Sequence, residues 1–389
     1  MNERILISGA SIAGLTLAHW LNRLGFQPTV VERAPALRAG GNGVDVRGHA
    51  AAVAERMGIM PQVRELAADV LGIKFVDAGD RSVARVDTRD PGSVEIMRGD
   101  LVALLRTVTD VEILFGDSIQ ALEQDDEGVT VTFEKAPERR FALVAGADGL
   151  HSQVRRLAFG PDEEFIQHRG HYFAFANADA ALGEDRWMTM FNTPGRMAGI
   201  YRSGNHAQAK AYFTFRSAPR DVDHRDLSAQ KQIVSEAFGD DTSWRTGELL
   251  DSALADPDFY FDALAQVHMG SWSAGRVVLV GDAAWCASPV SGAGAELALV
   301  GAYRLAGELA AAGGQHRLAF GRYDAALRPL VTARQRIGPN IRLMVPGSDG
   351  ARCVRDALAR LPLLKGMGVV ERYAQARNAR PLPEYARVR

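Results

Sequence analysis

The first 33 residues contain the feature that most restricts how this chain can fold. Residues 4–8 (RILIS) form a short apolar run typical of a buried strand, and residues 12–25 place apolar side chains at helical spacing before a glycine. A second apolar run follows at residues 27–33 (QPTVVER). A strand, a helix and a strand in this order predict a parallel sheet with a right-handed crossover. We therefore expect an α/β fold with a Rossmann-like domain.

The turn between that first strand and helix reads GASIAG, which fits the fingerprint G-x-G-x-x-G except at its second glycine. The outer glycines allow a tight turn and close packing of the helix on the strand, and a small middle residue lets the backbone approach a pyrophosphate. The pyrophosphate would lie on free N–H groups at the positive end of the helix dipole. The predicted binding turn consists of Gly9, Ser11, Ile12, Ala13 and Gly14. The alternative is a fortuitous glycine turn without a ligand.

An acidic residue, Glu32, stands at the end of the second predicted strand. A carboxylate at this place can accept hydrogen bonds from both ribose hydroxyls and disfavours a 2′-phosphate. We therefore expect FAD or NAD rather than NADP as the resident dinucleotide.

The character of the chain changes near residue 165. Short alternating runs such as HYFAFAN, RWMTMFN, RMAGIYR and QAKAYFTFR predict an antiparallel sheet, followed by a helix at residues 227–238. The α/β pattern returns near residue 275, and helical segments follow it. The expected division is 1–164 and 275–320 for two parts of a split dinucleotide-binding domain, 165–274 for a mainly antiparallel substrate domain, and 321–389 for a C-terminal helical region.

Two later motifs follow the fingerprint. One is GADGLHSQVR, with Asp148 at the end of a predicted strand, and the other is GDAAWCASPVSGAG at residues 281–294. Taken alone, the first could be an ordinary turn, and the second could be a buried strand followed by a helix that Asp282 caps. Their order behind the fingerprint favours a shared nucleotide site.

These three motifs together resemble the signatures of the FAD-dependent aromatic hydroxylases, the group A flavoprotein monooxygenases. The layout is most similar to the tetracycline-inactivating and antibiotic-tailoring enzymes. The resemblance implies one bound FAD, NADPH or NADH as transient reductant, O2 and a small-molecule substrate. It also places oxygen transfer at the flavin C4a position, so no side chain is assigned as catalytic.

The resemblance implies roles for individual residues. Glu32 and Arg33 would hold the adenosine ribose, Arg98 would contact FAD, and Asp148 would support the FAD region. Asp282 would receive a ribityl hydroxyl or position the diphosphate. The remaining expected cofactor contacts are Asp45, Gly281, Pro289, Gly292, Ala293 and Gly294; for Asp45, a charged loop pair with Arg47 is the alternative.

Three residues depart from the family pattern: Trp285, Ala293 and Glu296 stand where a histidine, a polar residue and an asparagine are common. An acid near the flavin would oppose the helix dipole there. The substrate-pocket candidates are Arg47, Met188, Met190, Tyr201, Tyr212, Phe213, Phe215 and Trp285. About half of the strand residues can face one pocket, because side chains alternate along a strand; core packing is the alternative for each. We expect a largely apolar aromatic or polyketide-like substrate.

Composition limits the partners. The 389 residues carry a net charge of -2, which gives no reason to expect nucleic acid or an anionic membrane as partner. No apolar run is long enough to span a membrane. The two cysteines allow neither a disulfide framework nor a cysteine-rich metal site, and no metal motif is present. Without a recognisable secretion signal, we expect a cytoplasmic monomer or homodimer.

Other functions remain open at this stage. A FAD-binding protein with non-redox, cyclase-like chemistry would be compatible with Trp285 and Glu296. An epoxidase or oxidase acting on a non-aromatic substrate is another possibility. An NAD-dependent dehydrogenase fits least well, because it gives the two later motifs no role.

Overall fold

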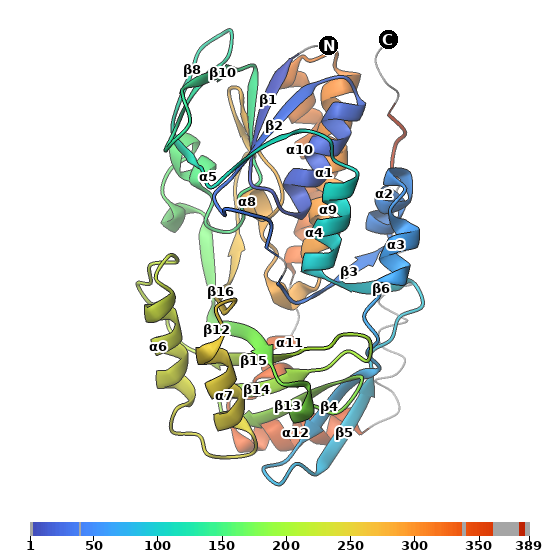
Figure 1. Ribbon diagram of the computed structural model, residues 1–389, viewed down its shortest axis with the longest axis vertical. Coiled ribbons are helices and arrows are strands. Elements are labelled where there is room, and N and C mark those ends of the chain that lie inside the picture. The colour runs from blue at the N-terminus through green and yellow to red at the C-terminus, as the bar shows by residue number, and fades with distance from the viewer. Residues whose placement is uncertain (1–2, 39, 337–339, 361–380, 386–389) are drawn as a thin grey trace.

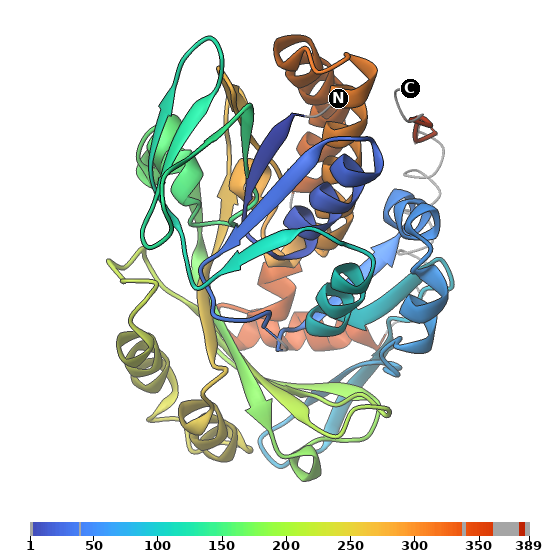
Figure 2. The ribbon, with the colours of Figure 1, turned by 45° about the horizontal axis from the view of Figure 1, so that its top comes forward.

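The computed structural model describes residues 3–38, 40–336, 340–360 and 381–385, and it has two parts that share one chain (Figure 1). A parallel sheet with its helices forms one part, and a larger, mainly antiparallel sheet forms the other. Figure 2 shows the same arrangement after a turn of the view. The expected fold class is confirmed.

The parallel sheet has the strand order β17-β18-β11-β1-β2-β7, and only the β17–β18 pair is antiparallel. The central strand β1 is flanked by β2 and β11, as the strand–helix–strand pattern requires. A three-stranded sheet of β8, β9 and β10 adjoins it. The strands of both sheets are β1 (Arg4–Ser8), β2 (Gln27–Glu32), β7 (Glu112–Phe115), β8 (Ile119–Gln124), β9 (Val129–Phe133), β10 (Arg139–Phe141), β11 (Leu143–Gly146), β17 (Ser273–Ala274) and β18 (Val277–Leu279).

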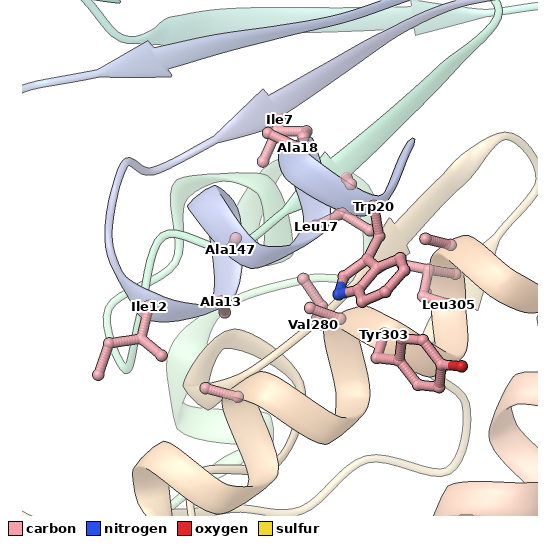
Figure 3. Close-up of a cluster of buried hydrophobic side chains, with 14 of the residues drawn as sticks. Ile7, Ile12, Ala13, Leu17, Ala18, Trp20, Ala147, Val280, Tyr303 and Leu305 are labelled. Carbon is pink, nitrogen blue, oxygen red and sulfur yellow. The ribbon is translucent and has the colours of Figure 1, made fainter. Parts of the chain in front are cut away.

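A layer of helices covers the parallel sheet. The central one, α9, packs against α1, α2 and α10, so residues almost 300 positions apart form one core. In Figure 3, Trp20 of α1 lies against Tyr303 of α9, with the ring centroids 4.7 Å apart. The helices of this part are α1 (Ile12–Arg23), α2 (His49–Met57), α3 (Met60–Glu65), α4 (Arg98–Thr107), α5 (Gln153–Ala158), α8 (Asp282–Trp285), α9 (Gly294–Ala311) and α10 (His316–Gln335).

The second sheet has seven strands in the order β16-β12-β15-β14-β13-β4-β5. Residues 72–87 fall within the segment expected to belong to the dinucleotide-binding domain, yet β4 pairs in parallel with β13 and carries β5 with it. The expected boundary at residue 164 is therefore wrong for this hairpin. The strands are β4 (Gly72–Val76), β5 (Ser82–Asp87), β12 (Ile166–Ala178), β13 (Trp187–Thr193), β14 (Arg196–Tyr201), β15 (Ala209–Arg216) and β16 (Tyr260–Val267).

The two faces of the seven-stranded sheet have different neighbours. Met188 pairs with Tyr201, and Tyr212 pairs with the residue two positions before Tyr201, so these side chains share one face. Phe213 and Phe215 lie on the opposite face, where they contact Phe238 of α6 (Leu227–Phe238). Helix α7 (Thr246–Ala255) covers the same side. The assignment of Phe213 and Phe215 to a substrate pocket is therefore wrong, because both are core residues.

The described part of the C-terminal region is mainly helical, with helices at residues 316–335, 340–344 and 349–359. Helix α12 (Asp349–Ala359) follows α11 (Asn340–Met344), and Arg355 places its guanidinium 4.0 Å from the Phe75 ring centroid of β4. The helical expectation for residues 361–380 and 386–389 lies outside the described residues. Among the helices that are described, none is long and apolar enough to cross a bilayer.

Truncation of Phe213 tests its place in the core. We expect Phe213→Ala to lower the free energy of unfolding by about 3–5 kcal/mol, because a fully buried aromatic side chain is lost and a cavity remains. Urea unfolding followed by circular dichroism measures the change. Leu318→Ala, which removes a side chain that is 44% exposed, is the control and should cost less than about 1 kcal/mol. Equal losses in the two variants would contradict the assignment.

Candidate functional site

The turn after β1 accepts only glycine at its two outer positions. Gly9 has φ +104°, and a Cβ there would lie 2.6 Å from the carbonyl oxygen of Ala147. A Cβ at Gly14 would lie 1.9 Å from the carbonyl oxygen of Gly9, so helix α1 could not approach the strand. The N-cap residue, Ser11, makes no side-chain capping bond. The first amides of α1 are therefore left for a ligand at the positive end of the helix.

Arg98 closes this turn from the side. It begins α4, and its Nη2 donates to the Oγ of Ser11 at 2.7 Å. Burial lowers the pKa of the Arg98 guanidinium, and the nearby Tyr260 and Asp282 raise it. Among the described residues, no carboxylate lies within ion-pair distance of Arg98. A partly desolvated cation beside an uncapped helix terminus is suited to a phosphate-bearing ligand.

Glu32 makes two backbone contacts that the sequence did not predict. Its Oε2 accepts from the backbone amide of Ala10, and its Oε1 accepts from that of Ala34, each at 2.8 Å. The carboxylate thus holds the glycine turn next to the end of β2. Each carboxylate oxygen has a further lone pair, so contact with a ribose stays compatible with these bonds. Arg33, beside it, is exposed.

Asp148 joins three elements at the same edge of the sheet. Its Oδ1 accepts from Ser152 Oγ at 2.5 Å, and its Oδ2 accepts from Ser8 Oγ at 3.2 Å and from the amide of Val154 at 3.1 Å. Burial raises the pKa of this carboxyl, and the hydrogen bonds from Ser152 and Val154 oppose that rise. The motif therefore braces the ends of β1 and β11 against the start of α5.

The third motif meets the first turn of α1 directly. Gly281 has φ +68°, and a Cβ there would lie 2.9 Å from the Cβ of Ala13. At the next residue, burial raises the pKa of the Asp282 carboxyl, and the Arg98 guanidinium lowers it. The structure therefore brings the two glycine corners together.

The loop before α9 is met by strand β3 (Gly43–Arg47). Arg47 Nη2 donates to the carbonyl oxygen of Gly292 at 3.4 Å, and Asp45 lies 4.0 Å from Arg47. The loop contains the short helix η3 (Pro289–Ser291), and Gly292 follows it with φ +60°. Ala293 is buried, and Gly294 begins α9. Arg47 thus contacts the loop itself, whereas Asp45 pairs with Arg47 and accepts a hydrogen bond from Ser93 Oγ at 3.0 Å.

One strained residue in this loop was missed by sequence reasoning. Ser288 has φ +74°, which is uncommon for a residue with a Cβ. Its Oγ is buried and has no hydrogen-bond partner among the described residues. Strain and an unpartnered hydroxyl at one position are typical of a ligand-binding loop. Nothing in the sequence marks this serine apart from the proline that follows it.

The structure changes the interpretation of two residues that depart from the family pattern, Glu296 and Trp285. Glu296 is buried, but Arg334 of α10 donates to both of its carboxylate oxygens at 3.0 Å. The expectation of an acid that opposes the α9 dipole is therefore wrong, because the charge is neutralised locally. Trp285 packs in the core against Trp272 and Tyr323, with ring centroids 4.5 and 5.7 Å away. It is not a pocket residue.

The face of the seven-stranded sheet that carries Met188, Met190, Tyr201 and Tyr212 also holds a polar contact. The hydroxyl of Tyr201 donates to Glu95 Oε1 at 2.9 Å, joining this sheet to β6 (Ser93–Met97). Burial raises the pKa of the Glu95 carboxyl, and the bond from Tyr201 opposes the rise.

Two further aromatic residues share that face. Phe175 stacks on Tyr260, with the ring centroids 4.8 Å apart. Their alternation along β12 and β16 could have indicated them from the sequence, whereas the Glu95 contact depends on how the two sheets meet.

Comparison with known proteins decides the family. A family described as "FAD binding domain" matches residues 3–319. A flavin-dependent monooxygenase of Legionella longbeachae is 40% identical over 343 residues, covering 87% of this chain and 88% of the relative. The chain belongs to the FAD-dependent monooxygenase family.

Two other known proteins are similar to this monooxygenase over most of its length. An uncharacterized protein of Mycobacterium tuberculosis is 43% identical over 342 residues, covering 86% of this chain and 92% of the relative. The crystal structure of the tetracycline destructase Tet(51) superimposes with a TM-score of 0.86 at 34% identity, covering 99% of this chain and all of that one. The fold similarity therefore includes both sheets and the C-terminal region.

The residues present fit FAD. The glycine turn that no Cβ can enter, the uncapped terminus of α1 and the guanidinium of Arg98 together suit an anionic dinucleotide. The buried, unpartnered hydroxyl of Ser288 offers a polar contact at the other corner.

Loss of the Arg98 cation should weaken cofactor retention in this monooxygenase. We expect Arg98→Met to raise the dissociation constant for FAD by about tenfold or more, because a hydrogen bond from a charged group contributes about 1.5–3 kcal/mol. Quenching of flavin fluorescence during titration of the apoprotein measures the constant. Arg64→Met, which removes an exposed arginine paired with Glu55, is the control and should leave it unchanged. An unchanged constant in Arg98→Met would exclude this role.

The pair of Glu296 and Arg334 makes a separate prediction about stability. Arg334→Met should lower the free energy of unfolding by about 3 kcal/mol, because it leaves a buried carboxylate without its partner. The double variant Glu296→Leu/Arg334→Met should recover most of that loss. Denaturant unfolding of the FAD-loaded protein checks both values, and additive losses in the double variant would argue against a mutually neutralising pair.

Proposed function

We propose that this monooxygenase uses NADPH or NADH and O2 to insert one oxygen atom into a largely apolar aromatic or polyketide-like small molecule. The single observation that carries the proposal is the contact of the two glycine corners, where Gly281 lies against Ala13. One dinucleotide can then be held at both ends. The sequence has only one complete dinucleotide fingerprint, so the nicotinamide nucleotide would have no binding turn of its own. That reductant would bind transiently.

Named residues would divide the binding of FAD between them. The first turn of α1 and Arg98 would hold the pyrophosphate, and Glu32 with Arg33 would hold the adenosine ribose. Asp282 would accept a hydroxyl of the ribityl chain. When bound, FAD would accept a hydride and activate O2, which are reactions that amino-acid side chains do not perform.

The start of α9 would stabilise negative charge beside the flavin. Ala293, the N-cap residue, makes no side-chain capping bond, so the first amides of the helix remain available. Because Arg334 neutralises Glu296, the terminus keeps its positive character. Gly292 and Gly294 would let the flat flavin ring approach the backbone of the loop before α9. Asp45 and Arg47 of β3 would border the flavin site beside that loop.

The substrate side would combine an apolar surface with a polar contact. Tyr212 would offer aromatic surface for a flat molecule, and Met188 and Met190, which are buried in a cluster with Phe75, would support that surface from below. The hydroxyl of Tyr201, held by Glu95, fixes a polar group at the edge of that surface. The similarity to a tetracycline destructase supports a polycyclic substrate.

The non-redox, cyclase-like alternative has lost its support. It rested on an acid near the flavin and on a tryptophan in the loop. Arg334 neutralises Glu296, and Trp285 lies in the core. For the cellular setting, the free cysteines Cys286 and Cys353 are consistent with a reducing cytoplasm. A monomer or homodimer remains our expectation.

A turnover assay with labelled oxygen tests the proposal. Purified protein should be yellow, and NADPH or NADH should bleach the flavin anaerobically. With tetracycline as the probe substrate and 18O2, mass spectrometry should find one labelled oxygen atom in the product. Tyr212→Ala should raise KM for the probe several-fold, whereas Phe213→Leu on the opposite face should not. Unlabelled product, or a flavin that neither nucleotide reduces with or without the probe, would overturn the proposal.

A further inference from the structure

One polar cluster has no role in the proposed function, although its Asp262 is close enough to Asp282 to raise the pKa of that carboxyl. His151 belongs to the loop between β11 and α5, Asp262 belongs to β16, and His224 precedes α6. One ligand atom from each of the three residues lies within 4.8 Å of the others. We propose that His151, His224 and Asp262 bind one divalent transition-metal ion, with Zn²⁺ as the preferred ion. This inference goes beyond the proposed oxygenation and does not depend on it.

Two of the three ligands are already in contact. The Nε2 of His151 lies 3.0 Å from Oδ1 of Asp262, close to the separation of about 3.4 Å between two ligands of a tetrahedral zinc ion. Asp262 belongs to β16, whereas His151 belongs to the loop after β11. A metal ion at this place would replace one hydrogen bond with two coordination bonds.

Asp262 is held by a second layer of contacts. The hydroxyl of Tyr260 donates to its Oδ2 at 3.0 Å, and the amide of Ala263 donates to its Oδ1 at 2.8 Å. Asp262 is buried, with 6% of its surface exposed. Metal sites characteristically orient a ligating carboxylate in this way, since hydrogen bonds to the ligand fix its direction.

The third ligand needs one local rearrangement. The ring of His224 is stacked on that of His151, with the centroids 3.3 Å apart and an angle of 24° between the planes. In stacked rings the nitrogen lone pairs lie in parallel planes and do not meet. His224 is exposed on a turn, so rotation of its side chain alone can bring a ring nitrogen toward the other two ligands.

The chemistry of the cluster favours a transition metal. An imidazole binds a metal ion through the lone pair of a ring nitrogen, and the cluster offers two such rings. Two nitrogens and one carboxylate oxygen suit Zn²⁺ with a water in the fourth position, whereas Mg²⁺ and Ca²⁺ prefer oxygen ligands throughout. Asp162 and Asp223 add negative charge around His224.

The position of the cluster gives the ion a structural task. His151 lies three residues after Asp148, which braces the parallel sheet, and Asp262 lies in the seven-stranded sheet. A bound ion would link these two parts and the loop before α6. Because the ion binds the folded chain, zinc should raise the thermal midpoint of unfolding.

Equilibrium dialysis of the FAD-loaded protein tests the site without any turnover. After treatment with a chelator, wild-type protein should take up one Zn²⁺ per chain in a saturable manner, measured by elemental analysis. His224→Ala and His224→Gln should weaken that binding by at least about tenfold. His206→Ala is the matched control, because His206 also pairs with an aspartate, Asp100, but has no second histidine in the cluster. It should bind zinc as the wild type does.

Copper provides an independent view of the ligands. Electron paramagnetic resonance of one equivalent of Cu²⁺ should show coupling to two nitrogens in the wild type and to one in His224→Ala. The flavin absorbance of each variant confirms that the protein is folded and loaded. Absence of saturable zinc binding, or equal binding in wild type and both His224 variants, would overturn the proposal whether or not the oxygenation assay succeeds.

Discussion

The contact between Gly281 and Ala13 governs the arrangement of the flavin-binding part. It brings the turn after β18 within van der Waals distance of the first turn of α1, so any side chain at position 281 would separate them. Two neighbouring interactions lie at the same place. Arg98 donates to Ser11 beside the first turn of α1, and it also lowers the pKa of the Asp282 carboxyl. The chemistry of the site therefore follows from one point of close backbone packing.

Much of this arrangement could be predicted from the sequence because local rules determine it. The strand–helix–strand start and the helix at residues 227–238 follow from periodicity, and the glycine turn follows from steric limits that act within a few residues. The convergence of two motifs about 270 residues apart also follows, since they end β1 and β18, which are parallel strands of one sheet with only β11 between them.

The remainder depends on which long-range partners meet. The sequence of β4 is an unremarkable apolar run, and nothing local tells it to pair with β13 rather than with the parallel sheet. Alternation shows that Phe213 and Tyr212 face opposite ways but not which face α6 will cover. In the same way, Glu296 reads as an acid beside the flavin until Arg334 is placed, 38 residues later. The residues His151, His224 and Asp262 lie far apart in the sequence and form no recognisable metal-binding motif.

The order of these pieces along the chain has a consequence for synthesis. The turn at Gly9 leaves the ribosome early, but Gly281 and α9, which complete the other corner, follow more than 270 residues later. Meanwhile β4 and β5 must wait for β13 before they have a partner on that side. Contacts so distant in sequence form slowly, since the intervening chain must be ordered first. A nascent chain can therefore complete the cofactor site only when more than three quarters of it has been made, and until then its unfinished sheets expose apolar faces to chaperones.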